Sequence, residues 1–150
     1  RPLHTDREWA AATKLQIENR DPCHSLEGYT RFKEAQMARY RSMAASGLGR
    51  WYGAFKGETL VADMGLFHDG EGAARYQSVE TDADHRRQGI CARLLVESAR
   101  MLAHEFGPID HAVIVADPEG PATGVYRSVG FEVVETQVGL QWWEGLSAPA

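Results

Sequence analysis

Basic side chains and a glycine lie between an extended stretch and a helix near the middle of the chain, at residues 85–92. The extended run covers residues 74–81, and an amphipathic helix of about sixteen residues follows the glycine. The first turn of a helix leaves backbone N–H groups without partners, and the helix dipole adds about half a positive charge there. Arg86 and Arg87 add further positive charge, and Gly89 lets a bulky ligand approach the backbone. This arrangement predicts a binding site for a phosphate group.

Two common phosphate-binding motifs are absent from this turn. A P-loop requires Gly, four residues and then Gly-Lys-Ser/Thr, and a dinucleotide fingerprint requires three glycines in the strand-to-helix turn. The pattern here is Arg-x-x-Gly-x-Cys at residues 86–91, followed downstream by Tyr-x-x-x-Gly-Phe at residues 126–131. Together they resemble the acetyl-CoA-binding and fourth-helix signatures of the GNAT acyltransferase superfamily, in which Gly or Ala stands at the position of Cys91. The resemblance covers nearly the whole chain and is strongest over residues 75–131.

The resemblance implies acetyl-CoA as the co-substrate and two stretches that bind it. Backbone amides of the turn would hold the pyrophosphate of coenzyme A, and the residues implied are Arg86, Arg87, Gln88, Gly89, Ile90, Cys91 and Ala92. The preceding strand would hold the pantetheine arm through Val79 and Thr81, often beside a β-bulge that separates two parallel strands. Asp117 and Glu119 lie in the loop where relatives often carry an Asn that contacts the coenzyme.

Acetyl transfer to an amine requires a base, stabilisation of the carbonyl oxygen and a proton donor for the departing thiolate. The resemblance implies Tyr126 as the general acid, because a Tyr at this helix position in many relatives points its hydroxyl at the coenzyme sulfur. Glu80, at the end of the strand, is the implied base. Two other interpretations stay open: Tyr126 as a core aromatic, and Glu80 as a solvated carboxylate or a partner of Arg86. Simple alternation puts Glu80 on the strand face of Tyr76 and Ser78.

Other reactive side chains have simpler interpretations. His85 is expected to be a solvated turn residue. Cys91 has no motif-linked His partner, so a packing role is favoured over a nucleophilic one. The six His of the chain are scattered without ligand spacing, so no metal is expected.

Hydrophobic periodicity predicts the elements that position these residues. Helices are expected at residues 6–19 with Asp6 as N-cap, at 28–45, at 90–106 and at 122–129. The second helix is expected to present on one side Tyr29, Phe32, Gln36, Tyr40 and Met43. Strands are expected at residues 51–55, 60–66, 74–81, 111–116, 131–135 and 138–143, with 111–116 buried.

The fold class implied by the resemblance is α/β (α+β), with a mixed, largely antiparallel central sheet of about six to seven strands and about four flanking helices. Residues 1–150 would form a single GNAT-like acetyltransferase domain. In the superfamily a first strand precedes the first helix, and only Arg1 to Leu3 stand there. These residues are expected to be the tail of that strand, truncated or missing at the N-terminus, and a longer natural chain is compatible with the sequence.

Composition agrees with this class of protein. A chain of 150 residues that is 43% hydrophobic can bury the core of one domain. The net charge of −5 argues against nonspecific nucleic-acid binding, and no apolar run is long enough to cross a bilayer. There is no signal peptide at this N-terminus, and Cys23 and Cys91 do not suggest a disulfide framework. A cytoplasmic location is expected, and a homodimer is one possible assembly.

The sequence therefore predicts an acetyl-CoA-dependent N-acetyltransferase that acts on a primary amine in a ternary complex. The acceptor stays open between a small-molecule amine and a peptide amine, and so does the use of a longer acyl donor. Acceptor specificity is expected to depend on Tyr29, Phe32, Arg39, Tyr40 and Trp143. Two alternatives are a non-catalytic acetyl-CoA-binding sensor or subunit, and a module that binds a different phosphate ligand.

Overall fold

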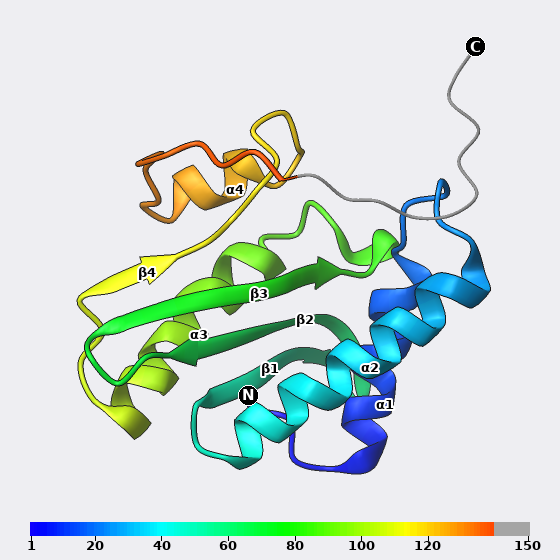
Figure 1. Cartoon of the computed structure of the whole chain (residues 1–150), viewed down its shortest axis with the longest axis horizontal. Helices are drawn as coiled ribbons and strands as arrows, with labels where there is room; N and C mark the ends of the chain where they lie inside the picture. The colour runs from blue at the N-terminus through cyan, green and yellow to red at the C-terminus, as the bar shows by residue number, and fades with distance from the viewer. Residues whose placement is uncertain (140–150) are drawn as a thin grey trace.

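A mixed sheet with helices on both faces organises residues 1–139, the part of the chain that this computed structural model describes (Figure 1). Its strands lie in the order β1 (Gly49–Lys56), β2 (Thr59–His68), β3 (Ala73–Thr81) and β4 (His111–Val113). The first three form the predicted antiparallel meander, and β4 pairs with β3 in the parallel sense. The described sheet has four strands, not the expected six to seven.

The helices form close to the predicted places. They are α1 (Asp6–Glu18), α2 (Leu26–Ala45), α3 (Ile90–Phe106) and α4 (Thr123–Ser128), with a 3-10 turn η1 (Ala83–His85) before α3. Figure 1 shows α1 and α2 lying together along one side of the sheet, while α3 lies on the other side. Across residues 1–139, no helix combines the length and the apolar character needed to cross a membrane.

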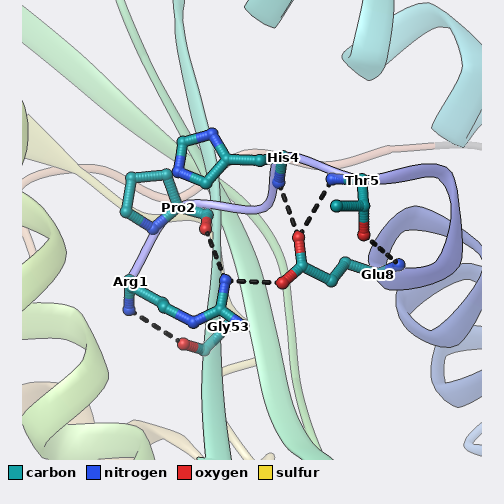
Figure 2. A network of polar contacts seen from close by, with 6 residues as sticks. All are labelled: Arg1, Pro2, His4, Thr5, Glu8 and Gly53. Atoms are coloured by element: carbon teal, nitrogen blue, oxygen red, sulfur yellow. Dashed lines mark hydrogen bonds and ion pairs between the residues drawn. The ribbon is translucent and has the colours of Figure 1, made fainter.

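The first helix is capped by Thr5, so the prediction of Asp6 as N-cap is wrong by one residue. Thr5 Oγ1 accepts from Glu8 N at 3.2 Å, and Glu8 Oε2 accepts from His4 N and Thr5 N at 2.7 and 3.0 Å, as Figure 2 shows. This reciprocal arrangement is a capping box, which pairs N–H groups that the helix leaves free. The two backbone N–H donors and nearby Arg1 lower the pKa of the Glu8 carboxyl to about 2.

Residues 1–3 lie along β1 as a short antiparallel bridge. Leu3 N donates to Trp51 O at 2.8 Å, and Gly53 N donates to Arg1 O at 2.9 Å. Figure 2 shows Arg1 against Gly53 at this point. The segment before α1 therefore extends the sheet at the free edge of β1, where the resemblance leads one to expect the tail of a first strand.

Two separate groups of core residues lie on the two faces of the sheet. The α3 face is built from Tyr52, Ala62, Met64, Leu66, Ala74, Tyr76, Leu94, Leu95, Leu102 and Tyr126. The α1/α2 face is built from Leu3, Trp9, Ala12, Met37, Trp51 and Phe67. Because helices cover both faces, β2 is buried continuously from Val61 to Phe67.

The buried side of α2 differs from the prediction. Lys33 and Met37 are its buried residues, whereas Phe32 is 55% exposed. The predicted stripe therefore lies to one side of the true contact face. Tyr29, Gln36, Tyr40 and Met43 remain half-buried along its edge.

The carboxyl-terminal strands are shorter than predicted. β4 covers His111–Val113 and is exposed, so the prediction of a buried strand over 111–116 is wrong. It pairs with β3 over three residues and then leaves it, and within residues 1–139 no strand covers its other edge. Residues 131–135 form no strand, and most of the predicted strand at 138–143 lies outside the described residues.

Candidate functional site

The site is built where β3 and β4 separate. The two strands pair only over residues 73–75 and 111–113, and Figure 1 shows them diverging toward their carboxyl ends. A cavity of about 360 Å³ lies in the opening. Its lining comes from the end of β3, the segment after β4 and the start of α4: Tyr76, Ser78, Val79, Glu80, Ile114, Val115, Ala116, Asp117, Gly120, Pro121, Ala122 and Tyr126.

A β-bulge lies in β3 beside this cavity. The antiparallel register with β2 runs from Gln77 opposite Gly65 to Glu80 opposite Asp63, so one extra residue is inserted on β3. Ser78 takes a φ of +45°, which is uncommon for a residue with a side chain. The bulge and the strand separation that the resemblance implies are thus both present.

The edge of β3 that faces the opening has main-chain groups that no neighbouring strand pairs with. Asp82 N donates to Val61 O at 2.9 Å on the β2 side, so alternation directs the main chain of Thr81 to the opposite side. There Thr81 O accepts from Asn19 Nδ2 at 3.0 Å and from Arg86 Nε at 3.1 Å instead of from a strand. Because Val79 lines the cavity, this edge can pair with an extended ligand.

The turn after β3 leaves the N-terminus of α3 open. Gly89 is the N-cap with a φ of +74°, and no side chain caps the first turn of the helix. Arg87 also takes a positive φ of +63°, and the stretch from Arg86 to Gly89 is exposed. Backbone N–H groups and two guanidinium groups therefore surround a solvent-facing helix N-terminus, which is favourable for an anion.

Asp82 organises the start of this turn. Its Oδ1 accepts from Asp84 N at 3.0 Å and lies 2.8 Å from His85 Nδ1. The bond to His85 is the main reason that the pKa of the Asp82 carboxyl is lowered. His85 is half-buried and paired, so its prediction as a solvated turn residue is wrong.

Tyr126 is held in α4 by the residues of its own motif. Gly130, with a φ of +101°, turns the chain so that Phe131 N donates to Tyr126 O at 3.1 Å. The Phe131 ring then meets the Tyr126 ring edge-on at 6.2 Å and the Tyr76 ring at 5.7 Å. The motif therefore fixes the phenol against the α3-face core.

The Tyr126 side chain is both a core residue and a cavity residue. It is 8% exposed and lines the opening, and within residues 1–139 its hydroxyl makes no hydrogen bond. Burial, followed by the proximity of Cys91 and Glu80, raises its pKa to about 12. The hydroxyl stays protonated at neutral pH and can donate a proton to a group bound in the cavity.

Cys91 lies at the start of α3 beside Tyr126. Its side chain packs against the α3-face core, and burial raises the pKa of its thiol to about 11. A protonated thiol is a poor nucleophile, which agrees with the packing role predicted for it.

Glu80 faces the side of the sheet opposite to the one predicted. Because the bulge adds one residue, Glu80 leaves the face of Tyr76 and lies toward α1, where its Oε2 accepts from Asn19 Nδ2 at 3.0 Å. It is half-buried, and no salt bridge joins it to Arg86 within residues 1–139. Burial raises the pKa of the Glu80 carboxyl, against the opposing effects of Asn19, Lys33 and Arg86.

Comparison with known proteins decides the family. A model described as the acetyltransferase (GNAT) family matches residues 9–131. The chain belongs to this GNAT family. Among curated proteins, none matches the chain in sequence at a significant level.

Solved structures show the same fold. A transcriptional regulator from Bacillus halodurans aligns with a TM-score of 0.72 at 16% identity, over 95% of this chain and 97% of that one. An aminoglycoside antibiotic 6'-N-acetyltransferase from Acinetobacter haemolyticus aligns with a TM-score of 0.68 at 13% identity, over 97% and 98%. A predicted acetyltransferase with acetyl-CoA, from Clostridium acetobutylicum, gives 0.66 at 14% identity over 92% of each chain. At these identities the likeness concerns the fold alone.

The GNAT family uses acetyl-CoA, and the geometry above fits that molecule. An extended arm needs a strand edge that no other strand pairs with, which β3 offers after Arg75. A pyrophosphate needs uncapped N–H groups and positive charge, which the turn from Arg86 to Ala92 offers. No group of three or more His, Cys, Asp or Glu side chains in the described part of the chain is arranged to hold a metal ion.

A buried polar network behind β3 escaped the sequence analysis of this GNAT chain. Asp63 is fully buried, and its Oδ1 accepts from Gln16 Nε2 at 2.7 Å and from Trp51 Nε1 at 3.1 Å. Lys33, also buried, donates to Gln16 Oε1 at 3.3 Å. Burial raises the pKa of the Asp63 carboxyl to about 8 and lowers the pKa of the Lys33 ammonium. The available signal was a polar residue at an apolar position, such as Gln16 one turn after Ala12.

The residues expected to set acceptor specificity do not gather at one place. Tyr29 lies near Glu80, since that carboxylate adds to the burial that raises the pKa of the Tyr29 phenol. Tyr40 instead packs on Trp51 with ring centroids 5.0 Å apart and donates to Gln77 Oε1 at 3.3 Å. Phe32 and Arg39 are exposed on α2, and the last candidate, Trp143, lies outside the described residues.

Proposed function

We propose that this GNAT-family chain transfers an acetyl group from acetyl-CoA to a primary amine by direct transfer in a ternary complex. The observation that carries the proposal is the cavity at the separation of β3 and β4, because Val79, Glu80 and Tyr126 line it together. The family match over residues 9–131 supports a single catalytic domain.

The donor would lie along the open edge of β3 and end at the turn before α3. Val79 and Thr81 would pair with the pantetheine arm through main-chain groups. The pyrophosphate would bind the backbone amides of the turn, with charge from its two arginines: Arg86, Arg87, Gln88, Gly89, Ile90, Cys91 and Ala92. When bound, acetyl-CoA supplies an acetyl group on a thioester sulfur.

Glu80 and Tyr126 would carry out the proton transfers of the reaction. Glu80 takes a proton from the acceptor ammonium, directly or through water, so that the amine nitrogen has a free electron pair to form the N–C bond. As the C–S bond breaks, Tyr126 Oη donates its proton to the thiolate, and the remaining extra proton on the amide nitrogen passes to the tyrosinate, which leaves a neutral amide and the free thiol of coenzyme A. The raised pKa of the phenol keeps this proton available, and the raised pKa of the Glu80 carboxyl favours proton transfer to it.

An acceptor screen tests the proposal. The chain is mixed with acetyl-CoA and a panel of small amines, amino acids and peptides, and free thiol is measured over time. We expect thiol release that depends on at least one amine, together with acetyl-CoA binding in calorimetry. Acetyl-CoA binding without thiol release for any amine would favour a non-catalytic sensor. No acetyl-CoA binding would reject both the transferase and the sensor.

A further inference from the structure

The bulged end of β3 has an unfavourable backbone conformation that something must hold. Ser78 has a φ of +45°, in the left-handed region that glycine adopts freely and other residues rarely do. Such conformations persist where surrounding contacts determine them, and they gather at functional sites. Here the segment from Ser78 to Glu80 lines the proposed acetyl-transfer cavity.

Gln16 contacts this segment from the last turn of α1. Its side chain is fully buried, and its Nε2 donates to Ser78 O at 2.7 Å and to Asp63 Oδ1 at 2.7 Å. Its Oε1 accepts from Lys33 Nζ at 3.3 Å. Both amide hydrogens are therefore used, and a carboxamide paired on both ends cannot rotate without breaking buried hydrogen bonds.

Asn19 repeats the contact one helical turn later. Its Nδ2 donates to Thr81 O at 3.0 Å and to Glu80 Oε2 at 3.0 Å. Asn19 is the C-cap of α1 and lies three residues after Gln16, so both carboxamides lie on the same side of the helix and face β3. Gln16 holds the main chain at the start of the bulged segment, and Asn19 holds it at the end.

These contacts have a direct effect on the proposed base. In a regular strand Glu80 would share the face of Tyr76, toward α3; the bulge turns it toward α1, where Asn19 holds its carboxylate. A contact that maintains the bulge therefore also selects the face on which Glu80 lies.

We propose that Gln16 and Asn19 are positioning residues, which hold the bulged segment of β3 at Ser78 and Thr81 and so orient Glu80 toward the acceptor. The inference rests on the proposed acetyl transfer for its effect on turnover. The main-chain contacts themselves can be tested without any activity.

The first test removes the donors of Gln16 with Gln16→Met, which keeps a side chain of similar length. We expect kcat to fall about tenfold or more, because small displacements of reacting groups are costly, while KM for acetyl-CoA changes less. Adding Ser78→Gly should restore most of the lost kcat, because glycine takes the positive φ without strain. Circular dichroism and thermal unfolding show whether each variant folds. Unchanged kcat in folded Gln16→Met, or no recovery with Ser78→Gly, would overturn the role of Gln16.

The second test uses Asn19→Asp, which keeps the side-chain shape near the end of α1 and puts a negative charge beside Glu80. Like charges at hydrogen-bonding distance raise the pKa of a carboxyl group, so the acidic limb of the kcat/KM profile should move to higher pH. Lys14→Gln is the matched control, since it changes the net charge by the same amount on an exposed part of the same helix. Equal profiles for Asn19→Asp and Lys14→Gln would overturn the role of Asn19.

Amide hydrogen exchange separates this inference from the proposed function. If the parent chain shows no acetyl transfer, the proposed function fails, and the positioning role is judged by exchange alone. Gln16→Met should speed exchange at residues 79–82, including the Asp82 N–H that pairs with Val61 O, whereas Lys14→Gln should not. Equal exchange in the two variants would reject the positioning role even if the enzyme is active.

Discussion

The two faces of the sheet differ in chemistry although the same strands form both. The α3 face is filled by apolar side chains such as Leu95 and Leu102, and it holds Tyr126 through aromatic packing. The α1/α2 face contains a buried network of hydrogen bonds among Gln16, Lys33 and Asp63, which extends to the bulge of β3. One face places the proposed acid by packing, and the other places the proposed base by polar contacts.

The two faces therefore contribute differently to the stability of the fold and to the orientation of the site residues. Apolar burial is non-directional, so it contributes free energy of folding without fixing the orientation of a polar side chain. Buried hydrogen bonds contribute less net free energy each, but leaving them unmade is costly, so they select one geometry. The bulge needs such selection, because a shift of one residue in β3 would move Glu80 to the other face.

The largest expected effects are on turnover, when the proposed acid and base are removed one at a time. Tyr126→Phe and Glu80→Gln should each lower kcat/KM by about 10²- to 10⁴-fold. Because the pKa of the Glu80 carboxyl is raised, the parent should lose activity at a higher pH than an ordinary Glu would give, and Glu80→Gln should lose this acidic limb. Steady-state rates from pH 5 to 9 measure both.

Two conservative variants control this comparison. Tyr52→Phe removes a buried hydroxyl that has no hydrogen-bond partner among the described residues, away from the cavity lining. Glu71→Gln removes an exposed carboxylate. Both should keep the rate and pH profile of the parent. Parent-like turnover in Tyr126→Phe or in Glu80→Gln would remove that residue from the mechanism.

The next largest effect is on stability, from the apolar face. Leu95 is 1% exposed, and Leu95→Ala should lower the free energy of unfolding by about 2–5 kcal/mol through lost burial and a residual cavity. Urea unfolding measures this change. The pH profile of the remaining activity should keep its shape, because Leu95 takes no part in the contact between Glu80 and Asn19, and its main-chain oxygen accepts from Tyr76 instead. A shifted acidic limb in Leu95→Ala would contradict the separation of the two faces.

The parts of this site that depend on local pattern are predictable from the sequence. The turn before α3 and the motif around Tyr126 were predicted because glycine, arginine and aromatic residues occur there at short fixed spacings. The side of the sheet on which Glu80 lies was not predicted. A bulge is a single inserted residue, and its position depends on contacts with neighbouring helices and strands. Gln16 and Asn19 were missed for the same reason: their partners on β3 lie 61 to 62 residues away in sequence.

A smaller effect concerns the start of α1, the helix that carries both positioning residues. Thr5→Ala removes the N-cap oxygen and should cost about 0.5–2 kcal/mol of unfolding free energy. Ser25→Ala, at the cap of α2, should cost less, because Ser25 only accepts a hydrogen bond from Gly28 N and no reciprocal Glu bond completes a capping box there. The folded pKa of Glu8 is lowered to about 2, so the stability it contributes is present above pH 4.5 and is lost as pH falls toward 2. The free energy of unfolding should therefore change less between pH 7 and pH 3 in Glu8→Gln than in the parent. Equal changes in the two proteins would reject the capping box as a source of acid sensitivity.

The smallest expected effect on turnover comes from Asp63→Asn, which tests whether the polar face works with a neutral carboxyl. Asn keeps the oxygen that accepts from Gln16 and Trp51, so the contact of Gln16 with Ser78 should persist, and kcat at pH 7 should stay within about twofold of the parent.

The folded pKa of Asp63 is raised to about 8, so the stability it contributes is complete below pH 4 and is lost as pH rises through about 8. The parent should therefore lose stability relative to Asp63→Asn over that interval, and its Trp51 indole N–H resonance should titrate near pH 8 while that of Asp63→Asn stays constant. An indole resonance that is constant in the parent as well would mean that the Asp63 carboxyl does not change its charge near pH 8, and would reject this prediction.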